Sequence, residues 1–442
     1  MTDALLCLPF ALLLLGIALF PMLESTRHLW EHNRNKLLYS LGLGLAGLGV
    51  HLATGGAQDR MFHAALEYAA FIALIASLYI VSGGIYITGA FAGYPHVNTA
   101  FLGLGALLAN LLGTTGASMV LLRPLLRANQ HRKHTTHIVI FFIFTVSNCG
   151  GLLTPLGDPP LYLGFLRGVP FEWTLGLWPE WLFSNLSLLF LFHLIDSRAF
   201  TREDLATRDN LVDQIKAAAR PLHVRGHINF LFLAAILLTL LGSSYAVTPL
   251  FARALPAETA QAAGTLFQAA AMAVIAFASY RLTQPGIHAH NEFSFGPIKE
   301  VAAIFSGIFA AMVPALVVLE AHAPALGLSS ARHYFWATGI LSSLLDNAPT
   351  YLTFATLAAG QAGVSSEHLL ELVRTSPAPL VAISCGSVLM GALTYIGNGP
   401  NFMVKAVAEH QGVKMPGFLG YLKWSCAVLL PLFLLMTFIF FK

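Results

Sequence analysis

The stretch Ser147-Asn-Cys-Gly-Gly-Leu-Leu-Thr-Pro-Leu-Gly-Asp-Pro-Pro-Leu161 interrupts an apolar segment that runs from Ile138 to Leu166. Proline removes a backbone donor and clashes with the preceding helical turn, and glycine adopts dihedral angles that other residues avoid. We therefore expect the helix to unwind around Asp158. In hydrocarbon, unwound backbone is tolerated only where it is buried in protein or lines a polar cavity. An unwound membrane segment that carries an acid predicts a binding site.

The composition is that of a polytopic membrane protein. Of the 442 residues, 56% are hydrophobic and 10% are charged, whereas soluble proteins carry about 25% charged residues. The mean hydropathy is +0.70. The net charge of +3 gives no support for a nucleic-acid partner, and the four cysteines show neither metal-ligand spacing nor a disulfide pattern. No Gly-x-Ser-x-Gly or paired His-Glu motif is present, so we expect neither an enzyme nor a resident cofactor.

Apolar segments divide the chain into two halves. The predicted spans are 5–23, 37–53, 64–89, 135–166 and 175–195 in the first half, and 227–245, 259–281, 298–320, 379–406 and 420–441 in the second. Two further apolar stretches, 98–126 and 333–359, are broken at Gly113 and Asp346. Two crossings need roughly 40 residues, so each broken stretch either crosses once or enters and returns. The predicted domains are repeat 1 (1–195), a cytoplasmic linker (196–226) and repeat 2 (227–442).

Basic residues favour re-entrant hairpins at both broken stretches. With two hairpins, one face collects Arg27, Arg34, Lys36, Arg123, Arg127, Arg132, Lys133, Arg198, Arg202, Arg208, Lys216, Arg220, Arg225, Arg281, Lys414 and Lys423. The positive-inside rule makes this the cytoplasmic face. We therefore expect an all-α protein of about ten spans and two hairpins, in a bacterial-type inner (plasma) membrane, with both termini outside.

An internal repeat supports this arrangement. Residues 151–164 read GLLTPLGDPPLYLG, and residues 391–404 read GALTYIGNGPNFMV. Thr154 aligns with Thr394, and Asp158 aligns with Asn398. In the predicted topology the two copies start on opposite sides of the membrane. Inverted repeats with interrupted helices are typical of secondary transporters, which bind substrate near the midplane between the halves.

The hairpin followed by Gly-Gly-x-x-Thr-Pro-x-Gly-Asp-Pro-Pro resembles the ion transporter superfamily, which includes citrate-transporter-like proteins and NhaD-type sodium/proton antiporters. The resemblance covers nearly the whole chain and implies inverted repeats, two opposed hairpins and a homodimer. In dicarboxylate members the hairpin tips carry Ser-Asn-Thr. Here the tips read Gly113-Thr-Thr-Gly-Ala-Ser118 and Asp346-Asn-Ala-Pro-Thr350, a departure that speaks against carboxylate binding.

Asp158 is the strongest candidate for a functional residue. An ionised Asp at mid-membrane costs at least about 2.5–3.5 kcal/mol, so it needs a partner, a bound ion or a proton. The alternative is a helix cap before Pro159, and capping also competes with a transport role for Asp346 and Asn347. The other candidates lie at the hairpin tips or in the interrupted spans: Thr114, Thr115, Asn148, Thr154, Gly157, Thr350, Thr394, Asn398 and Asn401.

Two functions remain open for this site. Two aspartates without an arginine predict a transient sodium site at Asp158 and Asp346, with Na⁺ or H⁺ as the coupling ion and competition between them producing sodium/proton antiport. The alternative is a sodium- or proton-coupled citrate or dicarboxylate symporter, in which helix N-termini bind the carboxylates. The expected partners are membrane lipid and a small ion or carboxylate substrate.

Overall fold

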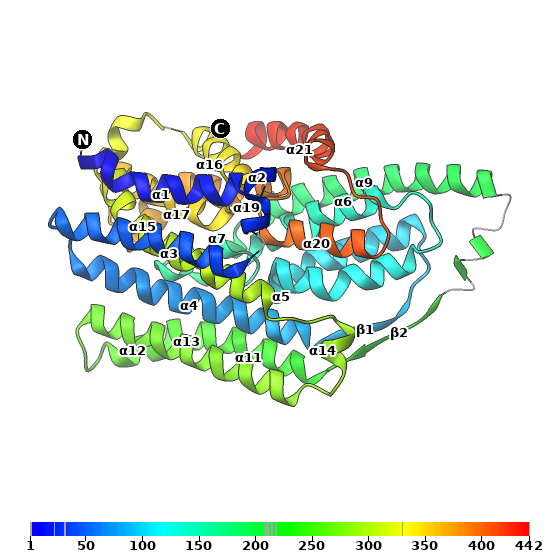
Figure 1. The fold of residues 1–442 in the computed structure, drawn as a ribbon, viewed down its shortest axis with the longest axis horizontal. Coiled ribbons are helices and arrows are strands. Elements are labelled where there is room, and N and C mark those ends of the chain that lie inside the picture. The colour runs from blue at the N-terminus through cyan, green and yellow to red at the C-terminus, as the bar shows by residue number, and fades with distance from the viewer. Residues whose placement is uncertain are drawn as a thin grey trace.

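The computed structural model describes the whole chain except residues 1, 22, 31, 208–211, 214, 217–218, 329 and 442. Long helices run side by side (Figure 1), and two short strands, β1 (Tyr86–Ala90) and β2 (Arg220–Arg225), form an antiparallel ribbon. Among the described residues, eight helical segments are long and apolar enough to cross a membrane. The chain is therefore an all-α multi-pass membrane protein, as the composition predicts.

The long helices of the first half are α1 (Thr2–Leu19), α3 (Asn33–Ala53), α4 (Gln58–Gly83) and α9 (Trp178–Thr207). A short helix, α2 (Glu24–Trp30), connects the first two, and α8 (Phe171–Leu175) precedes α9. The predicted third span, 64–89, is too long at its end. The helix stops at Gly83, and the chain then turns into the ribbon.

The predicted linker, 196–226, is more ordered than a charged loop. Residues 196–207 continue α9, which projects beyond its neighbours (Figure 1), and residues 220–225 form β2. Charged residues lower hydropathy without breaking a helix, because Arg and Glu are good helix formers. The remainder of the linker, Arg208 included, falls partly outside the described residues.

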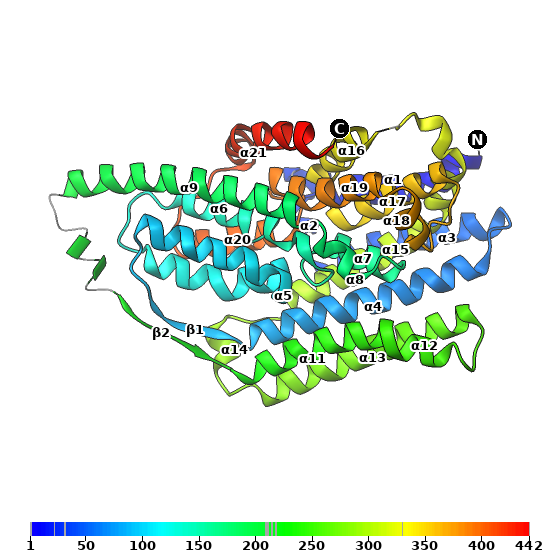
Figure 2. The same cartoon turned by 180° about the vertical axis from the view of Figure 1, so that it is seen from behind.

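The second half supplies α11 (Ile228–Gly242), a π-helical turn (Ser243–Val247), α12 (Thr248–Phe251), α13 (Ala257–Leu282), α14 (Ile287–His290), α15 (Gly296–His322) and α21 (Phe418–Phe440). A 3₁₀ turn (Ala323–Leu326) follows α15. Helices α11 and α13 lie against α4 along one edge of the molecule (Figures 1 and 2). Leu231 and Leu238 of α11 are 71% and 68% exposed. An apolar outer face of this kind suits contact with lipid.

The first broken stretch is a hairpin. It is formed by α5 (Pro95–Ala128), which is kinked at Gly113, where φ is 73° and ψ is 154°, a conformation that glycine adopts readily. At its base, Asn98 and Asn129 exchange side-chain hydrogen bonds of 3.0 and 2.9 Å. In a straight helix, residues that far apart in sequence would be separated by about 46 Å. The chain therefore enters and returns, slightly beyond the predicted bounds 98–126.

The second broken stretch also folds back. It consists of α16 (Ala331–Leu344) and α17 (Asn347–Ala362), joined through Leu345 and Asp346. The Tyr334 hydroxyl donates to Gln361 Oε1 at 2.5 Å, so the two ends of the stretch meet. A short helix, α18 (Leu370–Thr375), leads on to the next span.

Two interrupted spans follow the hairpins. The first consists of α6 (Thr136–Thr145), the 3₁₀ turn η1 (Cys149–Leu153) and α7 (Pro159–Leu166). The second consists of α19 (Pro377–Met390), the 3₁₀ turn η4 (Gly391–Leu393) and α20 (Gly399–His410). Figure 2 shows α18, which precedes the second span, toward the end of the molecule opposite the β1–β2 ribbon. Both spans unwind where proline and glycine predict it.

Candidate functional site

All four broken elements meet at one carboxylate. Asp158 directly precedes α7, and its side chain is 1% exposed. Thr114 Oγ1 of the first hairpin donates to Asp158 Oδ1 at 2.8 Å. Asn398 Nδ2 of the second interrupted span donates to the same oxygen at 3.2 Å. Asn347 Nδ2 of the second hairpin donates to Asp158 Oδ2.

These donors are all neutral. None of the ion pairs formed in the described part of the chain includes Asp158. An ionised carboxylate buried in a low-dielectric environment is costly unless it is paired with a positive charge. The protein therefore supplies hydrogen bonds to this carboxylate but no fixed countercharge among the residues described.

The first hairpin is held against its interrupted span by backbone contacts. Thr114 N donates to Gly157 O at 2.9 Å, and Thr154 Oγ1 donates to Asn110 O at 2.5 Å. Asn110 in turn accepts from Leu153 N through Oδ1 at 2.9 Å. Unwinding exposes these backbone groups, and the hairpin tip satisfies them. Asp158 is positioned as a result.

The second half repeats the same contact. Thr394 Oγ1 donates to Ser343 O at 2.5 Å, as Thr154 does to Asn110 O. Ser343 lies three residues before the break at Asp346, and Asn110 lies three residues before Gly113. The alignment of Thr154 with Thr394 thus corresponds to one contact formed twice.

Gly157 and Gly397 occupy equivalent positions in the two interrupted spans, and in each span the backbone passes close to an earlier glycine. A Cβ at Gly157 would lie 2.2 Å from Gly151 O, and a Cβ at Gly397 would lie 2.7 Å from Gly391 O. Such contacts leave no room for a side chain, so each interrupted span can fold tightly on itself only with glycine there.

A chain of buried amides joins the two interrupted spans. Asn398 Nδ2 also lies 3.2 Å from Asn148 Oδ1, and Asn148 Nδ2 donates to Asn401 Oδ1 at 2.7 Å. Asn401 Nδ2 then donates to Gly391 O and Thr394 O, both at 2.9 Å. The predicted residues Asn148, Asn398 and Asn401 therefore form one network that ends at Asp158.

The three remaining predicted site residues take no part in the contacts described so far. Asp346 caps α17 by accepting from Ala348 N at 3.1 Å, which is the alternative role expected for it. Thr350 Oγ1 donates to Asp346 O at 2.9 Å within the same helix. Thr115 lines a cavity beside Asp158.

This cavity has a volume of about 40 Å³. Its walls come from α4, the tip of the first hairpin and the unwound segment, and they include Leu78, Thr114, Gly157 and Tyr162. A volume of this size holds one water-sized species, because a water molecule occupies about 30 Å³ of the liquid. At the same junction, Asn347 Oδ1 is buried and has no hydrogen-bond donor in the described part of the chain. Carboxylate and amide oxygens are the ligands that hard cations prefer.

Sequence reasoning missed the residues that support the hairpin tips. Asn110 and Ser343 were not predicted, although their equal distance from the two breaks would have identified them as a pair. It also missed the buried hydrogen bond of 2.6 Å from Gln268 Nε2 to the Tyr162 hydroxyl. No sequence signal connects these last two residues, which lie 106 positions apart.

Comparison with known proteins agrees with this geometry. A family model described as "Putative citrate transport" matches residues 1–441. No curated protein matches the chain. The family match spans both hairpins and both interrupted helices, and it agrees with the resemblance to citrate-transporter-like proteins. The chain therefore belongs to this citrate-transport family of the ion transporter superfamily.

Proposed function

We propose that the chain is a sodium/proton antiporter in which Asp158 binds the two ions in alternation. The observation that carries the proposal is the burial of Asp158, 1% exposed, among donors that are all neutral. Because no fixed cation in the described surroundings neutralises the carboxylate, a proton or a mobile cation must do so. One carboxylate cannot hold both ions at once, so competition between them couples the two fluxes.

The size and chemistry of the site favour a small cation. The cavity of about 40 Å³ fits a single ion and is far too small for citrate. The unpartnered Asn347 Oδ1 adds a second oxygen ligand near the carboxylate. One backbone amide at each hairpin tip is already engaged, since Thr114 N donates to Gly157 O and Ala348 N to Asp346 Oδ1. These two are not free to bind a carboxylate substrate in this conformation.

The second candidate is a sodium- or proton-coupled citrate symporter, which the family description favours. Helices α7, α17 and α20 begin beside the junction at Pro159, Asn347 and Gly399. Helix N-termini attract anions. In this version Asp158 binds the coupling ion, and citrate binds after the hairpins separate from the interrupted spans.

Flux measurements on the purified chain in proteoliposomes distinguish the two functions. In vesicles that contain a pH-sensitive dye, external sodium should raise the internal pH through antiport. Asp158→Asn should reduce this response to that of protein-free vesicles. Asp59→Asn, which removes an exposed carboxylate at the start of α4, should leave it unchanged.

Two outcomes contradict the proposal. Full sodium-driven exchange in Asp158→Asn would remove this carboxylate from the ion site. Sodium-dependent uptake of labelled citrate, without any proton movement driven by sodium alone, would replace antiport with symport.

A further inference from the structure

A second cavity lies between α6, α9 and α21, far larger than the one beside Asp158. Its volume is about 360 Å³. Apart from Thr136, the residues that line it are basic or apolar, and they include His134, Ile195, Arg198, Ala199, Arg202 and Trp424. It lies toward the end of the molecule where α9 projects (Figure 1). This end carries the basic residues that predict a cytoplasmic face.

The two arginines that line the cavity are available for a ligand. Arg198 and Arg202 are exposed, lie one turn apart on α9, and have no ion-pair partner among the described residues. Two acids of α9, Asp196 and Glu203, are already engaged. Asp196 lies 2.6 Å from Arg132 Nη1, and Glu203 accepts from His134 N at 2.8 Å. Among the described side chains, no acid is paired with the two arginines of the cavity.

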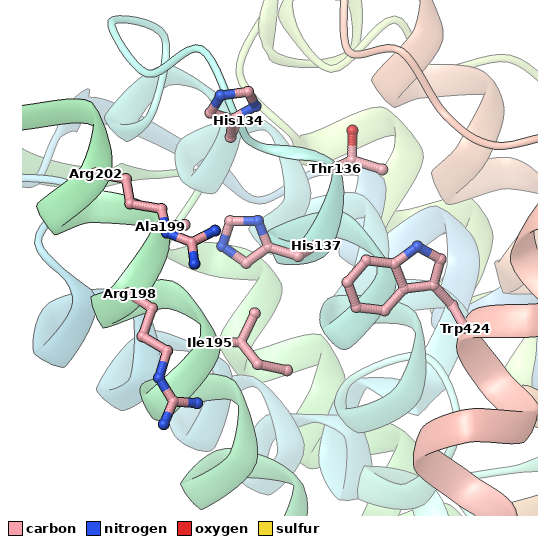
Figure 3. A pocket seen from close by; sticks show the side chains of 8 residues that line it. All are labelled: His134, Thr136, His137, Ile195, Arg198, Ala199, Arg202 and Trp424. Carbon is pink, nitrogen blue, oxygen red and sulfur yellow. The ribbon is translucent and has the colours of Figure 1, made fainter. Parts of the chain in front are cut away.

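Ile195, Ala199 and Trp424 give the lining an apolar part, which suits the boundary between lipid tails and headgroups. Figure 3 shows the indole of Trp424 pointing from α21 toward His137 of α6, with Arg198 and Arg202 on neighbouring turns of α9. Trp424 is 36% exposed and lies near the beginning of α21. Tryptophan is enriched at the membrane interface, where its ring meets both lipid and water.

The surface of α9 connects this cavity with the hydrocarbon region. Leu186 and Phe190 are 55% and 67% exposed, and Arg198 and Arg202 continue the same series in steps of four residues through Leu194. Residues four apart are neighbours on a helix surface. The helix thus presents an apolar ridge that runs obliquely around its axis and ends at two arginines. This order matches that of acyl chain and phosphate in a phospholipid.

We propose that this cavity binds the headgroup phosphate of an anionic phospholipid. Arg198 and Arg202 donate to the phosphate oxygens, which the planar guanidinium group binds through two parallel hydrogen bonds. Trp424 and Ile195 contact the glycerol and the upper part of the acyl chain. Basic pockets between membrane helices on the cytoplasmic side are suited to anionic headgroups. This site is separate from the ion site at Asp158 and does not depend on what is transported.

Native mass spectrometry of the full chain tests the proposal. After equilibration in micelles with equal amounts of phosphatidylglycerol and phosphatidylcholine, the wild type should retain phosphatidylglycerol preferentially. Arg198→Gln with Arg202→Gln should weaken this retention by about thirtyfold, because each arginine near an anionic headgroup contributes a factor of about five. Arg225→Gln with Arg281→Gln removes two exposed arginines elsewhere at the same end and should leave retention unchanged.

Additional measurements make the outcome decisive. Each variant should elute as the wild type does and unfold at the same temperature without added lipid, so that lost retention is not lost folding. Trp424→Ala should also weaken retention of phosphatidylglycerol, since a lipid contacts the indole whereas a free anion does not need it.

Equal retention in the Arg198/Arg202 and Arg225/Arg281 variants would overturn the proposal. Stabilisation of the wild type by inorganic phosphate alone, to the same extent as by phosphatidylglycerol, would assign the cavity to a free anion and overturn the lipid assignment.

Discussion

Among the aspartates whose side chains the structure describes, two are almost completely buried, and their surroundings differ in charge. Asp196 is 0% exposed and accepts from Arg132 at 2.6 Å, His137 at 2.8 Å and Asn98 at 3.0 Å. Asp158 is 1% exposed and accepts from one hydroxyl and two amides. The first carboxylate has a fixed positive partner, and the second has none among the residues described.

This difference separates a structural charge from a candidate transport charge. A permanent guanidinium neutralises Asp196 and holds α5 and α6 against α9. Asp158 has hydrogen bonds that keep its position, but its charge must be neutralised by something that can leave. Burial alone therefore does not identify an ion site. The absence of a fixed countercharge in the described surroundings, at a junction of broken helices, is the more informative feature.

The largest effect expected from this comparison is a difference in stability between variants of the two aspartates. Asp196→Asn should lower the free energy of unfolding by about 3 kcal/mol, the lower end of the range for breaking a buried ion pair, because Arg132 then loses its partner at 2.6 Å and keeps only Glu203 at 3.8 Å. Asp158→Asn should cost less than about 1 kcal/mol, because Asn347 can turn its amide and present the unpartnered Oδ1 to the new amide group. Unfolding of both variants in the same detergent measures the difference. Equal losses would mean that the two carboxylates are both structural.

A somewhat smaller effect should come from sodium itself. At a sodium concentration about 100 times its dissociation constant, binding stabilises the folded state by about 2.7 kcal/mol. The wild type should therefore unfold at a higher temperature in sodium chloride than in choline chloride at equal ionic strength. Asp158→Asn should show no such difference. A sodium effect of the same size in this variant would place the ion elsewhere.

Part of this site could be predicted because proline and glycine act locally. Pro155, Gly157 and Pro159 indicate an unwound segment wherever they fall in an apolar run. The match of Thr154 with Thr394 then located a second such segment, and the structure brings both to one junction. Re-entrant hairpins followed from segment length and the distribution of basic residues.

The remaining features depend on contacts that local sequence does not record. Asp196 was assigned to a charged linker because hydropathy falls after residue 195, yet α9 continues and the side chain is buried. Its pairing with Arg132 requires α9 and the turn between α5 and α6 to be placed correctly in space. Asp346 shows the opposite limit. From the sequence alone, an acid at a helix break can be interpreted either as a helix cap or as an ion ligand. The hydrogen bond from Ala348 N to Asp346 Oδ1 shows that Asp346 is a cap.

The finest test removes one neutral hydrogen-bond partner from each carboxylate. Thr114→Val deletes the hydroxyl that donates to Asp158 at 2.8 Å, and it should weaken sodium binding by about five- to tenfold, with little change in stability. Asn98→Ala deletes the amide that donates to Asp196 at 3.0 Å, together with the two hydrogen bonds that this amide exchanges with Asn129. It should lower the free energy of unfolding by about 2 kcal/mol without changing sodium affinity. Sodium-dependent thermal shifts report affinity, and unfolding in choline chloride reports stability. If Asn98→Ala also weakens sodium binding, the two carboxylates are coupled and the distinction between a structural and a transport charge fails.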